Sequence, residues 1–379
     1  MTASRPAELG PLNIIIFGLS ITSAWGNGHA TTYRALVRAL HARGHNVRFF
    51  ERNIPLFEQH RDLASPGYCR VGLYSDIEAL EDYVAEVTRA DLVVIGSYIP
   101  EGRRLIEWVM ARAGGVKAFY DIDTPATVNQ LARGTCEYLD PTQVPHFDLY
   151  LSFAGGPILR RLHNELGAAR PRPFYCSVDP LEYFPYPAAT KRYDLGYLGT
   201  YSADRQSALE RLLLEPARQW PHGSFYVAGV EYPEEIQWPA NVARAEHLAP
   251  ATHRGFYNHQ RFTLNITRDD LVANGYSPNV RLFQAAACGV PIISDSWRGL
   301  EEFFRPGSEI LVARSTSEVL EALHDPDEIE LREIGARARH RVLESHTAGH
   351  RAEELETHVL ELVRPPCAVS AEWPNRGCT

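Results

Sequence analysis

The stretch GYSPNVRLFQAAACGVPIISD, residues 275–295, decides the fold because it reads as a loop, a helix and a buried strand in direct succession. Pro278 suits the first position of a helix and Ser277 suits its N-cap, so the pattern predicts a helix over residues 278–288. The apolar run at residues 291–294 then has the length and composition of a buried strand. Helices and buried strands in alternation are typical of a mostly parallel α/β sheet.

The same alternation of apolar strand-length runs and amphipathic helix-length segments continues through most of the chain. Strands are expected in two groups: 12–18, 47–50, 92–96, 118–120 and 149–153, then 195–198, 225–228, 242–246, 262–266 and 291–294. Between the groups lies CSVDPLEYFPYPAATKRYD, a proline-rich polar stretch typical of a domain boundary. The sequence therefore predicts an α/β protein with two Rossmann-like, doubly wound domains.

The domain boundaries follow from the position of this stretch. We expect an N-terminal domain at residues 1–178, a linker at 179–192, a C-terminal domain at 193–345, a last helix within 346–363 and a flexible tail at 364–379. A chain of 379 residues is also too long for one ordinary hydrophobic core, which favours two domains.

Composition excludes several classes of protein. The formal net charge is −9, which disfavours nucleic acid or anionic lipid as a partner. The six cysteines contain no C-x-x-C pair, which fits reduced thiols and predicts no metal site. The apolar run near the N-terminus begins too late and ends too soon for a signal peptide or a membrane span. The sequence thus predicts a cytoplasmic protein without a transmembrane segment, and leaves the oligomeric state open.

The loops that follow the second group of strands are candidate ligand contacts, because doubly wound sheets bind ligands at the carboxyl ends of their strands. These loops and the first helix after them contribute Gly199, Tyr201, Arg205, His247 and Arg268. The helix predicted at residues 278–288 begins at the same edge, where its free N–H groups suit a phosphate. Arg281, one turn into this helix, lies among apolar residues and needs an anion. That anion is either a ligand phosphate or the carboxylate of Asp269 or Asp270.

The loops and helix starts that follow the first group of strands contribute a second set of candidate ligand contacts. His29 begins a helix after a glycine-containing turn, and Asp121 and Asp123 follow an apolar strand. His29 and Asp123 are candidates for acid–base work or acceptor binding, although both could simply cap or pack. Trp25 and Tyr98 lie on loops where a ring could stack on a sugar. The G-x-G-x-x-G fingerprint is absent, which disfavours a nicotinamide or flavin cofactor, and the D-x-D string is too short to predict a metal site.

Three segments carry a resemblance to a known family: SVDPLEYFP, YDLGYLGTYSADRQ and LNITRDDLVANGYSPNVRLFQAAACGVPIISDSWRGLEEFF. They resemble the two-Rossmann (GT-B) glycosyltransferases, in particular the spore-maturation-type (CgeB-like) branch of the retaining superfamily. The resemblance covers most of residues 190–325 and is only general in the first domain. It implies two domains facing across a cleft, with a nucleoside-diphosphate sugar on the C-terminal domain and an acceptor on the N-terminal one. It also implies that the last helix braces the N-terminal domain.

The resemblance further implies roles for individual residues. It assigns contacts with the donor phosphates to Ser277, Asn279 and Arg281 at the start of the helix. It implies that Gly199 and Tyr201 belong to a glycine loop whose backbone the donor approaches closely. The position of Gln284 usually holds a glutamate that binds the ribose hydroxyls. Because an amide has one acceptor oxygen where a carboxylate has two, we expect altered ribose binding here.

The expected function is that of a metal-independent glycosyltransferase of the hexosyltransferase type. It would transfer a sugar from a nucleotide-sugar co-substrate, expected to be a UDP-sugar, to a small-molecule or glycan acceptor, without a further cofactor. Retention is implied by the resemblance alone. The expected catalytic residues are His29, Asp123 and Arg281, and the expected acceptor contacts are Trp25, Tyr98 and Asp121. Two alternatives stay open: a nucleotide-sugar epimerase or hydrolase on the same fold, and a non-catalytic nucleotide-sugar-binding subunit.

Overall fold

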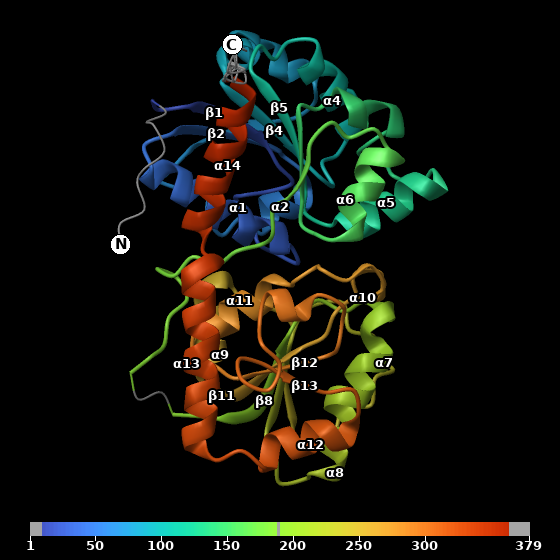
Figure 1. The fold of residues 1–379 in the computed structure, drawn as a ribbon, viewed down its shortest axis with the longest axis vertical. Coiled ribbons are helices and arrows are strands. Elements are labelled where there is room, and N and C mark those ends of the chain that lie inside the picture. Colours follow the sequence, from blue (N-terminus) through green and yellow to red (C-terminus); the bar gives the residue numbers. More distant parts are fainter. Residues whose placement is uncertain (1–9, 188–189, 364–379) are drawn as a thin grey trace, which may run out of the picture.

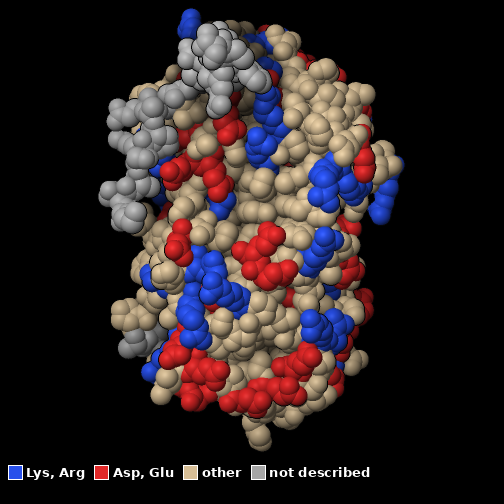
Figure 2. Space-filling view, viewed as in Figure 1, with Lys and Arg blue, Asp and Glu red and all other residues tan. Residues whose placement is uncertain are grey.

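The computed structural model describes residues 10–187 and 190–363 and shows two α/β domains stacked end to end, each built around one parallel sheet (Figure 1). The predicted tail at residues 364–379 lies outside the described residues. No helix in the described part of the chain is both long and apolar enough to span a membrane. Figure 2 shows acidic and basic side chains interspersed on one face of the molecule.

Within the described ranges, the first sheet has seven parallel strands in the order β3-β2-β1-β4-β5-β6-β7. Its strands are β1 (Asn13–Phe17), β2 (Asn46–Arg52), β3 (Arg70–Tyr74), β4 (Leu92–Gly96), β5 (Val116–Asp121), β6 (Leu149–Ser152) and β7 (Pro171–Pro173). Its helices are α1 (Gly28–Ala42), α2 (Pro55–Gln59), η1 (Glu78–Tyr83), α3 (Val84–Arg89), α4 (Gly102–Met110), α5 (Thr124–Arg133), η2 (Pro141–His146) and α6 (Pro157–Asn164). All five residues of β4 are buried, as expected for a central strand with helices on both faces.

The second sheet of the described chain has six parallel strands in the order β10-β9-β8-β11-β12-β13. Its strands are β8 (Tyr193–Leu198), β9 (Phe225–Ala228), β10 (Val242–Ala245), β11 (Gln260–Asn265), β12 (Ile292–Ser294) and β13 (Leu311–Val312). Its helices are η3 (Ala203–Arg205), α7 (Gln206–Leu209), η4 (Glu210–Leu214), α8 (Glu215–Gln219), α9 (Pro250–Asn258), α10 (Asp269–Asn274), α11 (Val280–Ala287), η5 (Leu300–Glu302), α12 (Thr316–His324) and α13 (Glu328–Ser345). The expectation of two doubly wound α/β domains is confirmed.

Strand order determines where a ligand can bind in each sheet. In the first sheet the chain runs outward from β1 to β3 and then returns to β4 on the other side of β1. In the second sheet it reverses in the same way between β8 and β11. Loops diverge at such a reversal and leave a crevice beyond the carboxyl ends of the strands. The loops after β1 and β8 therefore form the expected binding edges.

The domains are joined by two chain segments that lie side by side. The N–H of Val178 donates to the main-chain oxygen of His346 at 3.1 Å, and the N–H of Ala348 donates to Val178 at 2.8 Å. Helix α14 (Ala348–Val363) follows and packs on α1 of the first domain, with Glu356 2.8 Å from the ring of His45 (Figure 1). The last helix is thus part of the first domain's packing.

Some elements differ from the sequence-based expectation. Strands β3, β7 and β13 were not predicted, and all three lie toward the edges of their sheets. The segment before β4 is a 3₁₀ helix, η1, that continues directly into α3. Helix α11 begins at Val280 instead of Pro278, with Asn279 as the N-cap.

Candidate functional site

Three adjoining cavities lie between the domains, and Val280 of α11 lines all of them. The arginine chamber, about 220 Å³, contains Arg205 and Arg281. The histidine chamber, about 260 Å³, contains His29 and Asp123. The hinge chamber, about 230 Å³, is lined by the start of the interdomain linker and shares Gln284 with the arginine chamber. Residues of both domains line each chamber.

Arg281 is enclosed as predicted, with only 8% of its surface exposed. Its Nε donates to the main-chain oxygen of Leu198, and its Nη1 donates to Oδ1 of Asn265 at 2.9 Å. The guanidinium also lies over the ring of Tyr197, 4.8 Å from the centroid. Among the described residues Arg281 forms no ion pair, so the structural alternative with Asp269 or Asp270 is wrong. A buried arginine held only by neutral acceptors can still bind an anion in the chamber beside it.

The start of α11 differs in detail from the prediction. Ser277 does not cap the helix, because its hydroxyl donates to the main-chain oxygen of Gly275 at 2.9 Å. Asn279 holds the N-cap position without a capping bond, and its amide donates to Asn265 at 3.2 Å. Both residues line the histidine chamber. The first N–H groups of α11 are therefore not satisfied by an N-cap side chain, which suits an anionic ligand.

Arg281 contacts a buried polar network that the sequence pattern did not reveal. Asn265 ends β11, and Asp295 directly follows β12. Asp295 accepts from the N–H of Thr267 at 2.7 Å and from its hydroxyl at 2.8 Å, while burial raises the pKa of this carboxyl. Both polar residues stand at the carboxyl ends of apolar strands, which is the signal that could have identified them.

Gln284 is buried, with 4% of its surface exposed, and faces the arginine and hinge chambers. Its Oε1 accepts from the hydroxyl of Tyr257 at 3.0 Å. One lone pair of the amide oxygen is thereby engaged, and its second lone pair and the amide N–H groups remain for a ligand.

The other predicted donor contacts divide into two groups. Gly199, Arg205 and His247 line the arginine chamber together with Arg281. A Cβ on Gly199 would lie 2.8 Å from Nη2 of Arg281, so the absence of a side chain lets the guanidinium rest against this loop. Tyr201 does not line the chamber; its ring packs against Tyr232 with centroids 5.5 Å apart.

Arg268 joins the two domains instead of lining the arginine chamber. Its Nη1 is 3.0 Å from Oδ2 of Asp123 in the first domain, and its Nε is 3.4 Å from Asp204 in the second. The hydroxyl of Tyr98 donates to the same oxygen of Asp123 at 3.0 Å. Burial raises the pKa of Asp123, and the charge of Arg268 opposes that shift. Arg268 therefore holds Asp123 in place on the wall of the histidine chamber.

His29 lies on the second residue of α1 and faces the histidine chamber. Burial lowers its pKa to about 4, so the imidazole is neutral near pH 7. Its ring stands edge-on to Tyr98 with centroids 5.6 Å apart. Its Nδ1 is buried and has no hydrogen-bond partner among the described residues. His29 is therefore an uncharged residue of the chamber wall whose Nδ1 is enclosed by the protein.

The expectation that Asp121 faces the cleft is wrong. Its side chain is fully buried and accepts from Thr127 at 2.6 Å and from Tyr150 at 2.7 Å. Asp121 lies on the same face of β5 as Phe119, beneath α5, because side chains alternate along a strand. Burial raises its pKa to about 6.

Trp25 forms a stack that connects the domains at the rim of the arginine chamber. Its ring lies on His60 with centroids 4.1 Å apart and on His247 of the second domain at 4.3 Å. Trp25 thus contacts a residue of the arginine chamber, whereas Tyr98 reaches the histidine chamber through Asp123.

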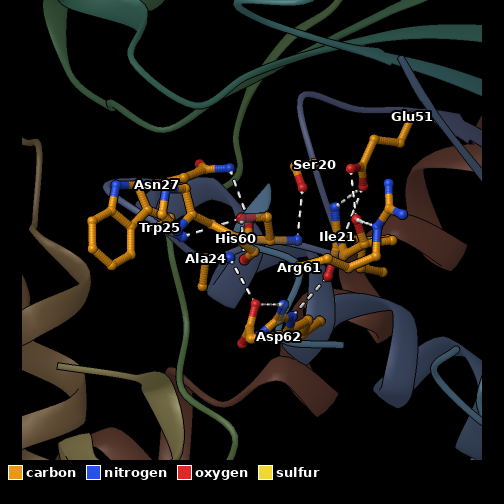
Figure 3. Close-up of polar contacts among 12 residues, drawn as sticks. Ser20, Ile21, Ala24, Trp25, Asn27, Glu51, His60, Arg61 and Asp62 are labelled. Atoms are coloured by element: carbon orange, nitrogen blue, oxygen red, sulfur yellow. Dashed lines mark hydrogen bonds and ion pairs between the residues drawn. The ribbon is translucent and has the colours of Figure 1, made fainter. Parts of the chain in front are cut away.

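The loop after β1, which carries Trp25, is held by two carboxylates that the sequence did not reveal (Figure 3). Glu51 is fully buried and accepts from the N–H groups of Ile21 at 2.7 Å and Thr22 at 2.9 Å. Asp62 accepts from the N–H of Ala24 at 2.9 Å and pairs with Arg34 at 2.8 Å. These contacts fix the glycine turn against the cleft.

The two doubly wound domains, whose strand ends meet at one cleft, have the GT-B fold found in glycosyltransferase structures. Residues 205–357 match the family model described as glycosyl transferase-like. No curated protein sequence matches the chain.

Solved structures are similar over nearly the whole chain. A sucrose-phosphate synthase from Thermosynechococcus elongatus has a TM-score of 0.64 and 16% identity, covering 93% of this chain and 99% of its own. HepE from Anabaena in complex with UDP-glucose has a TM-score of 0.66 and 11% identity, covering 92% and 100%. An alpha-glucosyltransferase in complex with UDP-glucose and DNA has a TM-score of 0.70 and 11% identity, covering 92% and 100%. At these identities the similarity establishes the fold.

Proposed function

We propose that this protein is a glycosyltransferase that transfers a sugar from a nucleoside-diphosphate sugar, a UDP-sugar, to a small-molecule or glycan acceptor. The observation that carries the proposal is Arg281, a buried arginine that has no carboxylate partner in the described part of the chain and faces a cavity between two Rossmann-like domains. The similar structures that hold UDP-glucose support a UDP-sugar as donor. The glycosyl transferase-like match over residues 205–357 supports the reaction class.

In the proposed reaction the protein acts by electrostatic stabilisation. Arg281, Arg205 and the N–H groups at the start of α11 would stabilise the diphosphate, whose negative charge grows as the glycosidic bond breaks. In a retaining front-face reaction the departing phosphate takes the proton of the acceptor hydroxyl. His29 and Asp123 then orient the acceptor. In an inverting reaction one of them must accept that proton.

Retention, metal independence and membership of the spore-maturation-type branch are parts of the same proposal. Among the described residues no cluster of three or more His, Cys, Asp or Glu side chains is arranged to hold a metal ion. The proposed acceptor is not nucleic acid, because the chain carries a net charge of −9 and its visible face mixes both signs (Figure 2). Product stereochemistry, and turnover with a chelator present, test these parts directly.

A non-catalytic nucleotide-sugar-binding subunit is the second candidate, and Gln284 favours it. Tyr257 already donates to the oxygen of this side chain, so a ribose hydroxyl finds fewer free acceptor lone pairs here than it would at a glutamate. Binding of UDP without any turnover of UDP-glucose, with or without acceptors, would select this candidate. Release of glucose or conversion of the donor without an acceptor would instead select a hydrolase or an epimerase.

Thermal-shift titration with UDP, GDP, dTDP and ADP tests the proposal first. A nucleotide at about 100 times its dissociation constant stabilises the folded protein by about 2.7 kcal/mol, which raises Tm by several degrees. A shift with UDP supports the donor site. No shift with any of the four nucleotides, in folded protein, would refute the proposed function.

A further inference from the structure

Tyr276, in the loop between α10 and α11, has a backbone conformation that tyrosine seldom adopts. Its φ is 52°, in the left-handed region where residues other than glycine, asparagine and aspartate are uncommon. Its side chain is only partly buried and belongs to none of the hydrophobic cores of the two domains. Because such a conformation costs free energy, the contacts that Tyr276 makes must hold it in place.

The ring of Tyr276 fits between two glycines, one from each domain. Gly156 lies directly before α6 of the first domain, and Gly299 lies directly before η5 of the second. A Cβ on Gly156 would lie 2.3 Å from Cδ2 of the ring, and a Cβ on Gly299 would lie 2.4 Å from Cδ1 on the opposite edge. Any side chain at either position would overlap the ring. The two glycines therefore form a slot that the ring fills.

The main chain of Tyr276 also connects the two domains. Its carbonyl oxygen accepts from the N–H of Gly155 in the first domain at 2.9 Å, and its own N–H donates to the main-chain oxygen of Arg298 at 2.7 Å. The guanidinium of Arg298 lies over the ring, 5.4 Å from the centroid. Tyr276 is thus fixed both to the loop after β6 of the first domain and to the loop after β12 of its own domain.

Two other contacts join the segment around α10 to the first domain, and both depend on polar side chains. Arg268 pairs with Asp123 at 3.0 Å, and Asn129 donates to Asp270 at 3.0 Å. All four side chains are partly exposed, so water can replace either contact at little cost. The contact of Tyr276 is determined by shape instead, and it therefore sets the separation of the domains more narrowly.

The loop that carries Tyr276 leads directly into α11, the helix of the proposed diphosphate site. The arginine chamber beside Arg281 has a second wall, which the first domain provides through the loop after β1 and the start of α1. The distance between the two walls depends on the contacts that hold the domains together, among them that of Tyr276.

We propose that Tyr276 is a positioning residue of the donor site. Its ring, seated between Gly156 and Gly299, holds the first-domain wall of the arginine chamber close enough to contact a nucleoside diphosphate on Arg281. The effect on the nucleotide rests on the proposed function, whereas the effect on domain separation does not. A ligand that contacts both walls binds only the closed fraction of the protein, so its apparent Kd rises as that fraction falls.

Replacement of Tyr276 by asparagine and by phenylalanine tests the assignment. Asparagine adopts positive φ readily but lacks the ring, whereas phenylalanine keeps the ring. In small-angle X-ray scattering without ligand, we expect Tyr276→Asn to have a larger radius of gyration than wild type, and Tyr276→Phe to match wild type. In calorimetry, the UDP Kd of Tyr276→Asn should rise roughly tenfold if the closed fraction falls to about a tenth, and that of Tyr276→Phe should not change.

Gly156→Ala is a second variant that disturbs the same contact from the first domain, and Gly167→Ala is its matched control. Gly167 also has a positive φ, 72°, but a Cβ there would lie 3.0 Å from Pro145 of the same domain. Both substitutions strain a left-handed backbone. We expect only Gly156→Ala to enlarge the radius of gyration and to weaken UDP binding.

An unchanged radius of gyration in Tyr276→Asn and Gly156→Ala, or unchanged UDP affinity in both, would overturn the assignment. Equal losses in Tyr276→Phe and Tyr276→Asn would also overturn it, because the ring would then not be the feature that matters. If Tyr276→Asn does not fold, the comparison of Gly156→Ala with Gly167→Ala decides alone. A wild-type protein that fails to bind UDP would refute the proposed function, and the scattering data would still show whether Tyr276 sets the domain separation.

Discussion

Replacement of Arg281 by alanine tests the central feature of the site. If the guanidinium binds a diphosphate, Arg281→Ala removes a charge-assisted hydrogen bond in a largely buried position. Such a bond contributes about 1.5–3 kcal/mol, so the Kd for UDP should rise about 10- to 150-fold. The same change removes the Arg281 hydrogen bond to the main-chain oxygen of Leu198 and one of the two donors to Oδ1 of Asn265, which should cost about 1–3 kcal/mol of folding stability unless water replaces the guanidinium.

The assay is isothermal titration calorimetry with UDP on the wild type and two variants. Arg339→Ala is the matched control, because Nε of Arg339 donates to the main-chain oxygen of Ala287 at 3.1 Å, at the opposite end of α11. This variant also loses a hydrogen bond to a neutral carbonyl, but it lies away from the cleft. We expect UDP affinity to fall in Arg281→Ala and to stay unchanged in Arg339→Ala. Equal UDP affinity in Arg281→Ala and wild type would refute the reasoning and make Arg281 a structural residue.

Three further predictions concern the same site and its support. Gln284→Glu should tighten UDP binding severalfold in calorimetry, because a carboxylate keeps one oxygen free beside Tyr257; unchanged or weaker binding contradicts a ribose contact. Gly199→Ala should weaken UDP binding, since its Cβ would lie 2.8 Å from the Arg281 guanidinium, whereas Gly255→Ala has 3.9 Å of room and serves as control. Burial lowers the pKa of His346 from its ordinary value of 6.5 to about 3. The unfolded chain therefore binds a proton at this residue below pH 6.5, whereas the folded protein does so only near pH 3. The free energy of unfolding should fall by about 1.4 kcal/mol per pH unit between these two values because of this residue. Urea denaturation at pH 7 and pH 5 should therefore show a smaller loss in His346→Gln than in wild type, and equal losses would contradict this.

The fold was predictable where strands are buried on both faces. The run LVVIG of β4 is apolar at every residue because helices cover both sides of the sheet, and such runs stand out in a sequence. Strand β7, with the sequence PRP, lies at the edge of its sheet, where proline is tolerated and neither length nor composition signals a strand. Strand β13 has two residues and gives even less signal.

The site was predictable only in part. The local sequence pattern indicates that a side chain is buried, but it does not identify the residue or ligand that the side chain contacts. The apolar neighbours of Arg281 indicated that it is buried, whereas the choice between a phosphate and Asp269 or Asp270 depended on how α10 and α11 lie in space. Asp121 and Asp123 were both placed at the cleft because they are two residues apart at the end of one predicted strand. The strand ends between them, so Asp121 keeps the alternation of β5 and enters the core, while Asp123 lies in the loop at the cleft.

The distribution of ion pairs explains how a protein with a net charge of −9 can present a cationic cavity. In the hinge chamber Arg34 and Arg38 pair with Asp62 and Glu182, each at 2.8 Å, so their charges are compensated. Arg268 is likewise compensated by Asp123 and Asp204. Among the described residues, the arginines of the arginine chamber form no ion pair; their hydrogen bonds go to neutral oxygens. Because neutral acceptors position a guanidinium without cancelling its charge, this chamber keeps its attraction for a diphosphate while the surrounding protein stays acidic.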